Sequence, residues 1–209
     1  MKRLKYNAPV VLTYTLISFL ALILNNVTNG WTNQNLFSVY RCGFDNVLAF
    51  FRLFGHAIGH GNLNHFTNNF VMILLLGPAL EEKYGSLKLL FSIVATAVIT
   101  GIIQCAISSN TALLGASGIV FMMIVMSSCT SFKDGQLPIT LLLILVIYLG
   151  DQVVAGLSAK DSISQMGHII GGLCGMGFGL TLSPNKRSAE KTKKYSSEEE
   201  KWLKTGKID

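Results

Sequence analysis

Four side chains in this 209-residue sequence have the types and spacing needed for acyl transfer, and they are Ser117, His168, His65 and Asn69. Ser117 lies within Gly115–Gly118, where small neighbours allow close backbone approach. A serine hydroxyl is a weak nucleophile until a base takes its proton, and His168 is the candidate base. His65 and Asn69 are four residues apart, so on a helix they share one face. Both can donate hydrogen bonds, so they could complete an oxyanion hole.

The elements that must position these residues are apolar segments. Half of the residues are hydrophobic and 13% are charged, whereas soluble domains carry roughly 25% charged residues. This composition disfavours a soluble globule and excludes a disordered chain and a small disulfide scaffold. Six stretches approach the ~20 residues that a bilayer-crossing helix needs; they are residues 8–26, 64–82, 87–108, 114–132, 137–156 and 164–183. We therefore expect an all-α membrane protein, a bundle of six transmembrane helices over residues 1–183.

The charges predict the orientation of this bundle. Residues 184–209 hold 8 Lys or Arg and 5 Asp or Glu, which is typical of a solvated tail. Lys and Arg gather before the first stretch, in the second and fourth connections and in the tail, so the positive-inside rule places both termini in the cytoplasm of a cell-membrane protein. No basic stripe interleaved with aromatic residues is present, and we expect no nucleic-acid partner.

The long connection 27–63 is rich in aromatic residues, which favour the membrane interface. We expect it to form a half-embedded outer loop between the first two helices. His56 and His60 within it raise the possibility of a metal site. No HExxH motif, carboxylate cluster or cysteine cluster accompanies them, so structural hydrogen bonds are the favoured interpretation, and neither metal nor cofactor is expected.

Depth in the membrane connects the four polar residues. The stretches that carry them enter from the outer face, and each polar group falls within the first turns, at ~1.5 Å per residue. Alone, Ser117 could pack or bond to a carbonyl, His168 could be interfacial and Asn69 could bridge two helices. Their common depth instead favours one site that opens to the outer face.

A repeat of small residues could bring the serine and the histidine together. Gly171, Gly175 and Gly179 form one face of the last stretch, and His168 lies near that face. If this face packs on the stretch 114–132, His168 comes beside Ser117. A generic packing seam would show the same glycine repeat.

These motifs resemble those of the rhomboid intramembrane serine proteases, in their basic six-span bacterial form. The resemblance covers about residues 40–182 and rests on a set of spaced motifs: His65-x3-Asn69, Gly115-Ala116-Ser117-Gly118, His168-x2-Gly171-x3-Gly175, Gly77-x3-Glu81-x3-Gly85 and His56-x3-His60-x4-His65. It implies a Ser117–His168 dyad that requires no Asp. It also implies an oxyanion hole from the Ser117 N–H and the side chains of His65 and Asn69.

The resemblance further implies substrates and an entry route. The expected substrates are transmembrane segments of membrane proteins with small or helix-weakening residues near the cleaved bond, admitted past the second and fifth spans from the bilayer. The glycines Gly115, Gly118, Gly171 and Gly175 would support the site by close packing. The oligomeric state is left open.

Two positions depart from the family pattern. Phe51-Arg52 stands where many members have Trp-Arg, and Phe121 stands where many have Tyr. Phe121 can still pack on His168 but offers no hydroxyl. A non-catalytic rhomboid-like protein that binds transmembrane helices is the alternative, although such proteins typically lack one or both dyad residues. A channel or transporter is disfavoured because the polar groups gather near one face and no inverted repeat is seen.

Overall fold

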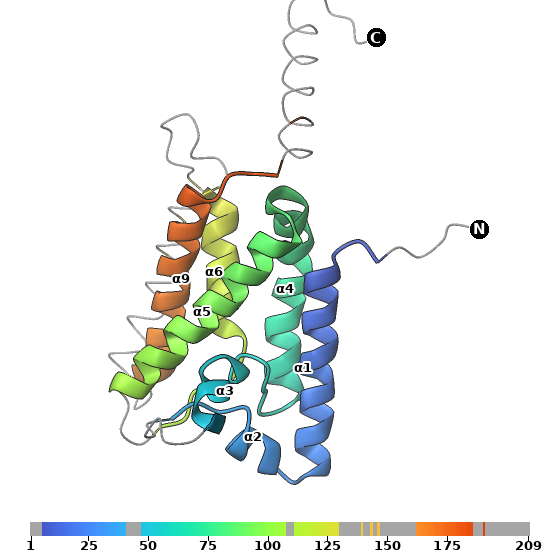
Figure 1. Ribbon diagram of the computed structural model, residues 1–209, viewed down its shortest axis with the longest axis vertical. Coiled ribbons are helices and arrows are strands. Elements are labelled where there is room, and N and C mark those ends of the chain that lie inside the picture. The colour runs from blue at the N-terminus through green and yellow to red at the C-terminus, as the bar shows by residue number, and fades with distance from the viewer. Residues whose placement is uncertain are drawn as a thin grey trace, which may run out of the picture.

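The computed structural model describes residues 6–40, 47–107, 111–129 and 162–185, with isolated positions at 139, 143, 146 and 190. The regular elements in these ranges are helices: α1 (Pro9–Val27), α2 (Trp31–Asn35), α3 (Val47–Gly55), α4 (Leu63–Tyr84), α5 (Ser86–Ile107), α6 (Ser117–Ser128) and α9 (Ser162–Thr181). One antiparallel bridge joins Val39 to Leu113. The long helices stand side by side, and α6 lies behind α5, between α9 and α4 (Figure 1).

The helices α1, α4, α5 and α9 differ from the expected stretches by no more than two residues at either end. In the described part of the chain, α1 and α5 are long and apolar enough to cross a membrane. The helix α4 is as long as α5, but polar residues such as His65 and Asn69 near its start lower its hydropathy. Most of the stretch 137–156 and most of the tail 184–209 lie outside the described residues, so the count of six spans stays a prediction.

The centre of the bundle is α6. Every residue from Ile119 to Met126 is buried, and Met122, Met123 and Met126 are fully enclosed. A helix that is apolar on all sides is stable only where neighbours cover all of it. The surrounding helices α4, α5 and α9 provide that cover, so the start of α6 is held from several directions.

Glycines allow α9 to pack directly on the backbone of α6. A Cβ atom added to Gly171 would collide with the carbonyl oxygen of Gly118, and one added to Gly175 would collide with the carbonyl oxygen of Met122. A Cβ atom added to Gly179 would lie 2.6 Å from Cβ of Cys129. The small-residue face of α9 is therefore the face in contact with α6.

A buried carboxylate joins α4 to the start of α1. Glu81 is 5% exposed. Its Oε1 accepts hydrogen bonds from Val10 N, at 3.0 Å, and from Ser86 Oγ, at 2.7 Å, and its Oε2 accepts one from Val11 N, at 3.1 Å. The first N–H groups of a helix have no partners inside the helix. Glu81 supplies those partners, and its negative charge also suits the positive end of the α1 dipole.

The outer connection between α1 and α4 is ordered around a buried cation. Arg52 on α3 is 8% exposed. Its Nε donates a hydrogen bond to the carbonyl oxygen of Asn35 at 2.8 Å, and its guanidinium carbon lies 4.8 Å from the ring centroid of Tyr40. One residue earlier, Val39 pairs with Leu113 through two backbone hydrogen bonds. This connection is thereby attached to the segment that leads into α6.

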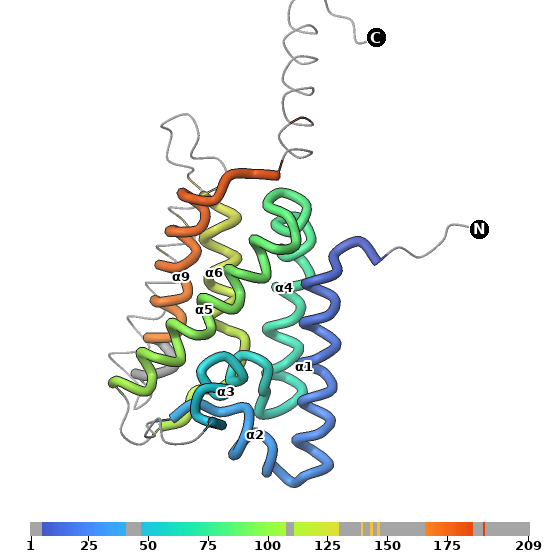
Figure 2. The backbone as a smooth tube through the Cα atoms, in the orientation of Figure 1, coloured from blue at the N-terminus to red at the C-terminus, as the bar shows by residue number. Residues whose placement is uncertain are grey.

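The chain after α9 returns to the turn between α4 and α5, as Figure 2 shows. Asn185 donates hydrogen bonds to two carbonyl oxygens at the end of α4, from its backbone N to Lys83 at 2.8 Å and from its Nδ2 to Glu82 at 2.7 Å. Lys88 Nζ donates to the carbonyl oxygen of Ser183 at 2.6 Å. These bonds fasten the segment after α9 to the end of α4 and the start of α5, at the end of the bundle opposite α3.

Candidate active site

Ser117 is the first residue of α6, which begins three residues later than the stretch expected from the sequence. The preceding Gly115 has φ +115°, a conformation that favours glycine. Its backbone N donates a hydrogen bond to the carbonyl oxygen of His56 at 2.8 Å. Residues 114–116 therefore form a turn that delivers a half-buried Ser117 at a helix N-terminus, where unpaired N–H groups favour negative charge.

His168 lies on α9, where this helix crosses the start of α6. Its ring stacks on the ring of Phe121, with centroids 4.4 Å apart and planes 7° from parallel. A Cβ atom added to Gly118 would lie 3.2 Å from the carbonyl oxygen of Gly167. Since Gly118 follows Ser117 and Gly167 precedes His168, this close contact brings the serine and the histidine to the same crossing.

His65 and Asn69 approach the same turn from α4. A Cβ atom added to Gly115 would lie 2.7 Å from Cε1 of His65 and 3.7 Å from Nδ2 of Asn69. A side chain at position 115 would therefore displace the imidazole of His65. His65 is half-buried and Asn69 is 7% exposed. The structure thus gathers all four polar residues of the sequence analysis around residues 115–118.

His60 is an additional member of this group. Its Nδ1 lies 3.1 Å from the carbonyl oxygen of Ile58, which can only accept, so Nδ1 carries the hydrogen. Its Nε2 is then an acceptor, 3.1 Å from Nδ2 of Asn69 and 3.4 Å from the backbone N of Ala116. Burial, and secondarily the nearby His65, lowers the pKa of His60 to about 4. A neutral His60 therefore connects Asn69 to the residue before Ser117.

Sequence reasoning assigned His60 only to structural hydrogen bonds in the outer connection and missed its contacts with Asn69 and Ala116. The available signal was its position five residues before His65, next to the start of α4. Edge-to-face ring contacts hold His60 in this place: its ring centroid lies 5.0 Å from that of His65 and 5.5 Å from that of Phe70.

His56 borders a small cavity beside Ser117. Its Nε2 lies 3.0 Å from the carbonyl oxygen of Ala97 and therefore carries the hydrogen. Burial lowers the pKa of His56 to about 4, so this side chain is neutral. The cavity, about 10 Å³, is also lined by Thr100, Ser117 and Gly167, and it has room for about one water molecule.

Among the described residues, no three His, Cys, Asp or Glu side chains are grouped as metal ligands. His60 uses both ring nitrogens in the hydrogen bonds just described, and His56 uses its Nε2.

The structure is a helical bundle with serine, histidine and amide side chains gathered at one helix start. Comparisons with known proteins identify the family to which such a bundle belongs. The Rhomboid domain model matches residues 48–185. Curated proteins named rhomboid protease GlpG, from Salmonella choleraesuis (strain SC-B67), Salmonella newport (strain SL254) and Salmonella typhi, are each 32% identical to this chain over 151 residues. The matched region is 69% of this chain and 54% of each relative, so the chain spans about half the length of these relatives.

The chain belongs to the rhomboid family. Members of this family are integral membrane proteins, in agreement with the apolar helices α1 and α5.

Proposed function

We propose that this protein is an intramembrane serine endopeptidase with Ser117 as nucleophile and His168 as general base. The observation that carries the proposal is the crossing of α6 and α9. Glycine contacts at Gly118 and Gly171 bring the two helices to backbone contact, and Phe121 holds the His168 ring in a parallel stack. Such positioning is what a nucleophile and base require, because the hydroxyl proton must be removed as the bond forms.

In the first step, the Ser117 hydroxyl oxygen attacks the carbonyl carbon of the substrate peptide bond, and its proton passes to His168. The carbonyl oxygen gains negative charge in this step. The groups that we propose to stabilise that charge are the Ser117 N–H and the side chains of His65 and Asn69. Asn69 has two N–H donors, one of which is directed to His60. The other donor of the amide remains for the oxyanion.

Collapse of this intermediate breaks the C–N bond, and the leaving amine takes the proton from His168. The carbonyl carbon then stays bonded to Ser117 as an ester. In the second step a water molecule gives a proton to His168 and attacks the ester carbonyl carbon. The bond to the Ser117 oxygen then breaks, and this oxygen takes the proton back from His168, which releases the acid and restores both residues. The cavity between His56 and Ser117 could hold such a water.

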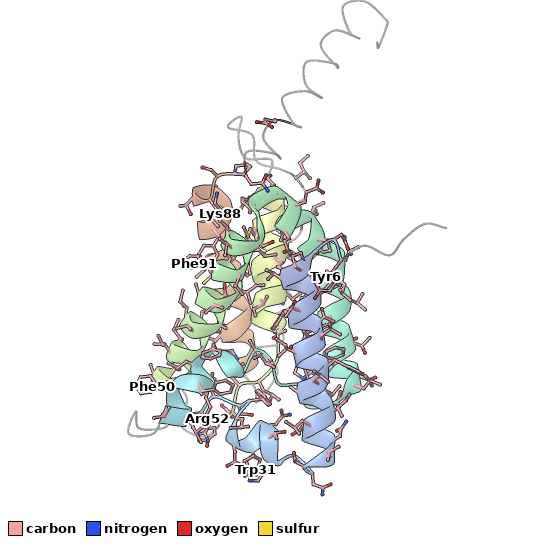
Figure 3. All side chains as sticks on the ribbon, turned by 45° about the vertical axis from the view of Figure 1, so that its right-hand side comes forward. Tyr6, Trp31, Phe50, Arg52, Lys88 and Phe91 are labelled. Atoms are coloured by element: carbon pink, nitrogen blue, oxygen red, sulfur yellow. The ribbon has the colours of Figure 1, made fainter. Side chains whose placement is uncertain are left out.

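The proposed substrates are membrane-spanning segments cut near the outer face. A peptide bond within a helix has its carbonyl surrounded by neighbouring residues, so a segment with helix-weakening residues is easier to present to Ser117. Lys88, at the start of α5, and Tyr6, just before α1, lie at the same end of the bundle (Figure 3). The positive-inside rule assigns this end to the cytoplasm. The helix α6 begins at Ser117, and its start lies nearer α3 than its other end does (Figure 1). This separation supports a cytoplasmic face at the α4–α5 turn and a site near the outer face.

The test is cleavage of a single-span reporter in proteoliposomes by the wild type and by Ser117→Ala and His168→Ala. Both variants should fall to background while reconstituting to the same level as the wild type. A serine-reactive fluorophosphonate should label the wild type at Ser117 and lose labelling in His168→Ala. Full cleavage by either variant would refute the dyad.

The second candidate is a non-catalytic protein that binds transmembrane helices, as some rhomboid-like proteins do. It predicts that wild type and Ser117→Ala capture the reporter equally and that neither cleaves it. The conjunction of Ser117, His168 and hydrogen-bond donors around one turn favours the enzyme.

A further inference from the structure

The segment between α3 and α4 carries His60 into the candidate site and lies outside the helices. Residues 56–62 form turns and irregular backbone, and His60 is fully buried within them. The position of its ring therefore depends on hydrogen bonds from neighbouring elements to this backbone. The hydroxyl of Tyr14, on α1, donates to the carbonyl oxygen of Ala57 at 2.6 Å. The Nδ2 of Asn33, on α2, donates to the carbonyl oxygen of His60 itself at 2.9 Å.

Asn33 is held on both sides of this bond. The helix α2 lies next to the end of α1 (Figure 1). There the backbone N of Asn33 donates a hydrogen bond to Oδ1 of Asn25, on α1, at 3.1 Å. On the other side, a Cβ atom added to Gly59 would lie 3.0 Å from Oδ1 of Asn33 and 2.5 Å from Cβ of Phe37. The segment that carries His60 is therefore packed directly against α2 and the residues that follow it.

The amide of Asn33 is only half used. Its Oδ1 is buried and has no hydrogen-bond partner among the residues that the structure describes. A buried polar atom without a partner is unfavourable, so this amide contributes less to the fold than a fully bonded one would. What Asn33 provides is one directed hydrogen bond, and that bond goes to the backbone of His60.

The hydrogen bonds continue from His60 into the candidate site. Its Nε2 accepts from Nδ2 of Asn69 at 3.1 Å and from the backbone N of Ala116 at 3.4 Å. A series of hydrogen bonds therefore runs from Asn25 through Asn33 and His60 to Asn69. Without the Asn33 amide, the His60 backbone can shift, and the amide of Asn69 loses the acceptor that orients it.

We propose that Asn33 is a positioning residue for the proposed oxyanion hole. Its amide fixes the backbone of His60, and the His60 ring then fixes the amide of Asn69. The inference rests on the proposed proteolytic function, because the developing oxyanion is what requires that amide to keep one orientation. Loss of a donor from an oxyanion hole lowers kcat by about 10²–10³-fold. Asn33 acts through two other residues, so we expect the smaller loss of about tenfold.

The test compares Asn33→Leu with Asn35→Leu in full-length protein reconstituted into proteoliposomes. Leucine has nearly the shape of asparagine but no hydrogen-bond donor. Asn35 is the matched control, because it also lies on α2 and its Nδ2 donates within that helix, to the carbonyl oxygen of Trp31 at 2.8 Å. We expect Asn33→Leu to lower kcat for the single-span reporter about tenfold without a change in KM, as for an interaction made in the transition state. Asn35→Leu should change neither constant.

A peptidyl boronate gives a readout that a loss of folded protein does not move. Boron bonded to the Ser117 oxygen is a tetrahedral anion that resembles the reaction intermediate, and such analogues report transition-state binding. Their dissociation constant is a property of the folded molecules alone. Asn33→Leu should weaken boronate binding about tenfold, and Asn35→Leu should leave it unchanged. Equal affinity of the two variants would overturn the role of Asn33.

The outcomes separate this inference from the proposed function. If the wild type neither cleaves the reporter nor binds the boronate, the proposed function fails and the role of Asn33 falls with it. If the wild type cleaves and Asn33→Leu matches Asn35→Leu, only the role of Asn33 is refuted. Asn33→Ser covers the case in which Asn33→Leu does not fold, because the shorter side chain adds no bulk beside Gly59. It should show the same losses, and wild-type values of kcat and boronate affinity in this variant would overturn the proposal.

Discussion

Gly171→Ala gives a direct test of the helix crossing that we propose to assemble the dyad. The added Cβ atom would collide with the carbonyl oxygen of Gly118 and lie 2.8 Å from its carbonyl carbon. Carbon atoms prefer separations of about 3.5–4.0 Å, so α9 must move away from α6 by roughly 1 Å. The blocking atoms belong to the backbone of Gly118 at the start of α6, so no flexible side chain can give way.

The consequence should be larger for catalysis than for stability. Overpacking of this kind costs about 1–3 kcal/mol of stability. A displacement of about 1 Å between reacting groups can reduce the rate by about 100-fold. Because His168 is three residues from Gly171 on the same helix, the displacement separates it from Ser117. We expect kcat/KM for the reporter to fall by about 100-fold at a temperature where the variant remains folded.

Gly172→Ala is the matched control, because its added Cβ would meet only Cγ2 of Val125, at 3.6 Å, an ordinary contact. Reporter cleavage in proteoliposomes and thermal unfolding in detergent should be measured for both variants. Gly172→Ala should cleave at the wild-type rate. If Gly171→Ala were as active as Gly172→Ala, the crossing would not position the dyad and the reasoning would be refuted.

Three further predictions concern the groups around the site. Glu81→Ala removes the hydrogen-bond acceptor at the start of α1 and should lower the free energy of unfolding by about 2–4 kcal/mol. Thermal unfolding measures this, with Glu82→Ala as the control because Glu82 is exposed. Equal effects of the two substitutions would contradict this role of Glu81. Phe121→Leu loses the aromatic stack on the dyad histidine and should lower kcat/KM by about tenfold, whereas Phe121→Tyr should preserve it; equal losses would argue against the stack. Burial lowers the pKa values of His56 and His60 to about 4 from 6.5, so as pH falls the unfolded chain takes up protons first. This stability should be complete above pH 6.5 and decline towards pH 4, by about 3 kcal/mol for each histidine, and a flat profile in pH-dependent unfolding would contradict it.

The helices could be predicted from the sequence because membrane-length apolar segments are a local property. The expected stretches 8–26 and 87–108 and the helices α1 and α5 differ by one residue at each end. The predicted start of α6 was three residues too early. Gly115 adopts a positive φ, so residues 114–116 form a turn that belongs to the connection before α6. Hydropathy does not distinguish a small apolar residue in a turn from one in a helix.

The candidate site could be anticipated only in part. The polar residues Ser117, His168, His65 and Asn69 were conspicuous against an apolar sequence, and a common depth suggested that they meet. The connection through His60 was not predictable, because it depends on which ring nitrogen faces Ile58 and which faces Asn69. The same holds for Glu81, whose partners on α1 are about 70 residues away in the sequence.

Different forces hold the two halves of this site. The contact of α9 with α6 depends on the absence of side chains at Gly171 and Gly118, so it tolerates almost no added volume. The proposed oxyanion side depends on directed hydrogen bonds, in which His60 orients the amide of Asn69 and the N–H of Ala116. Protonation of His60 would convert its acceptor nitrogen into a donor and break both bonds without moving α9. Acid should therefore impair the oxyanion side first, whereas added bulk at position 171 should impair the dyad first.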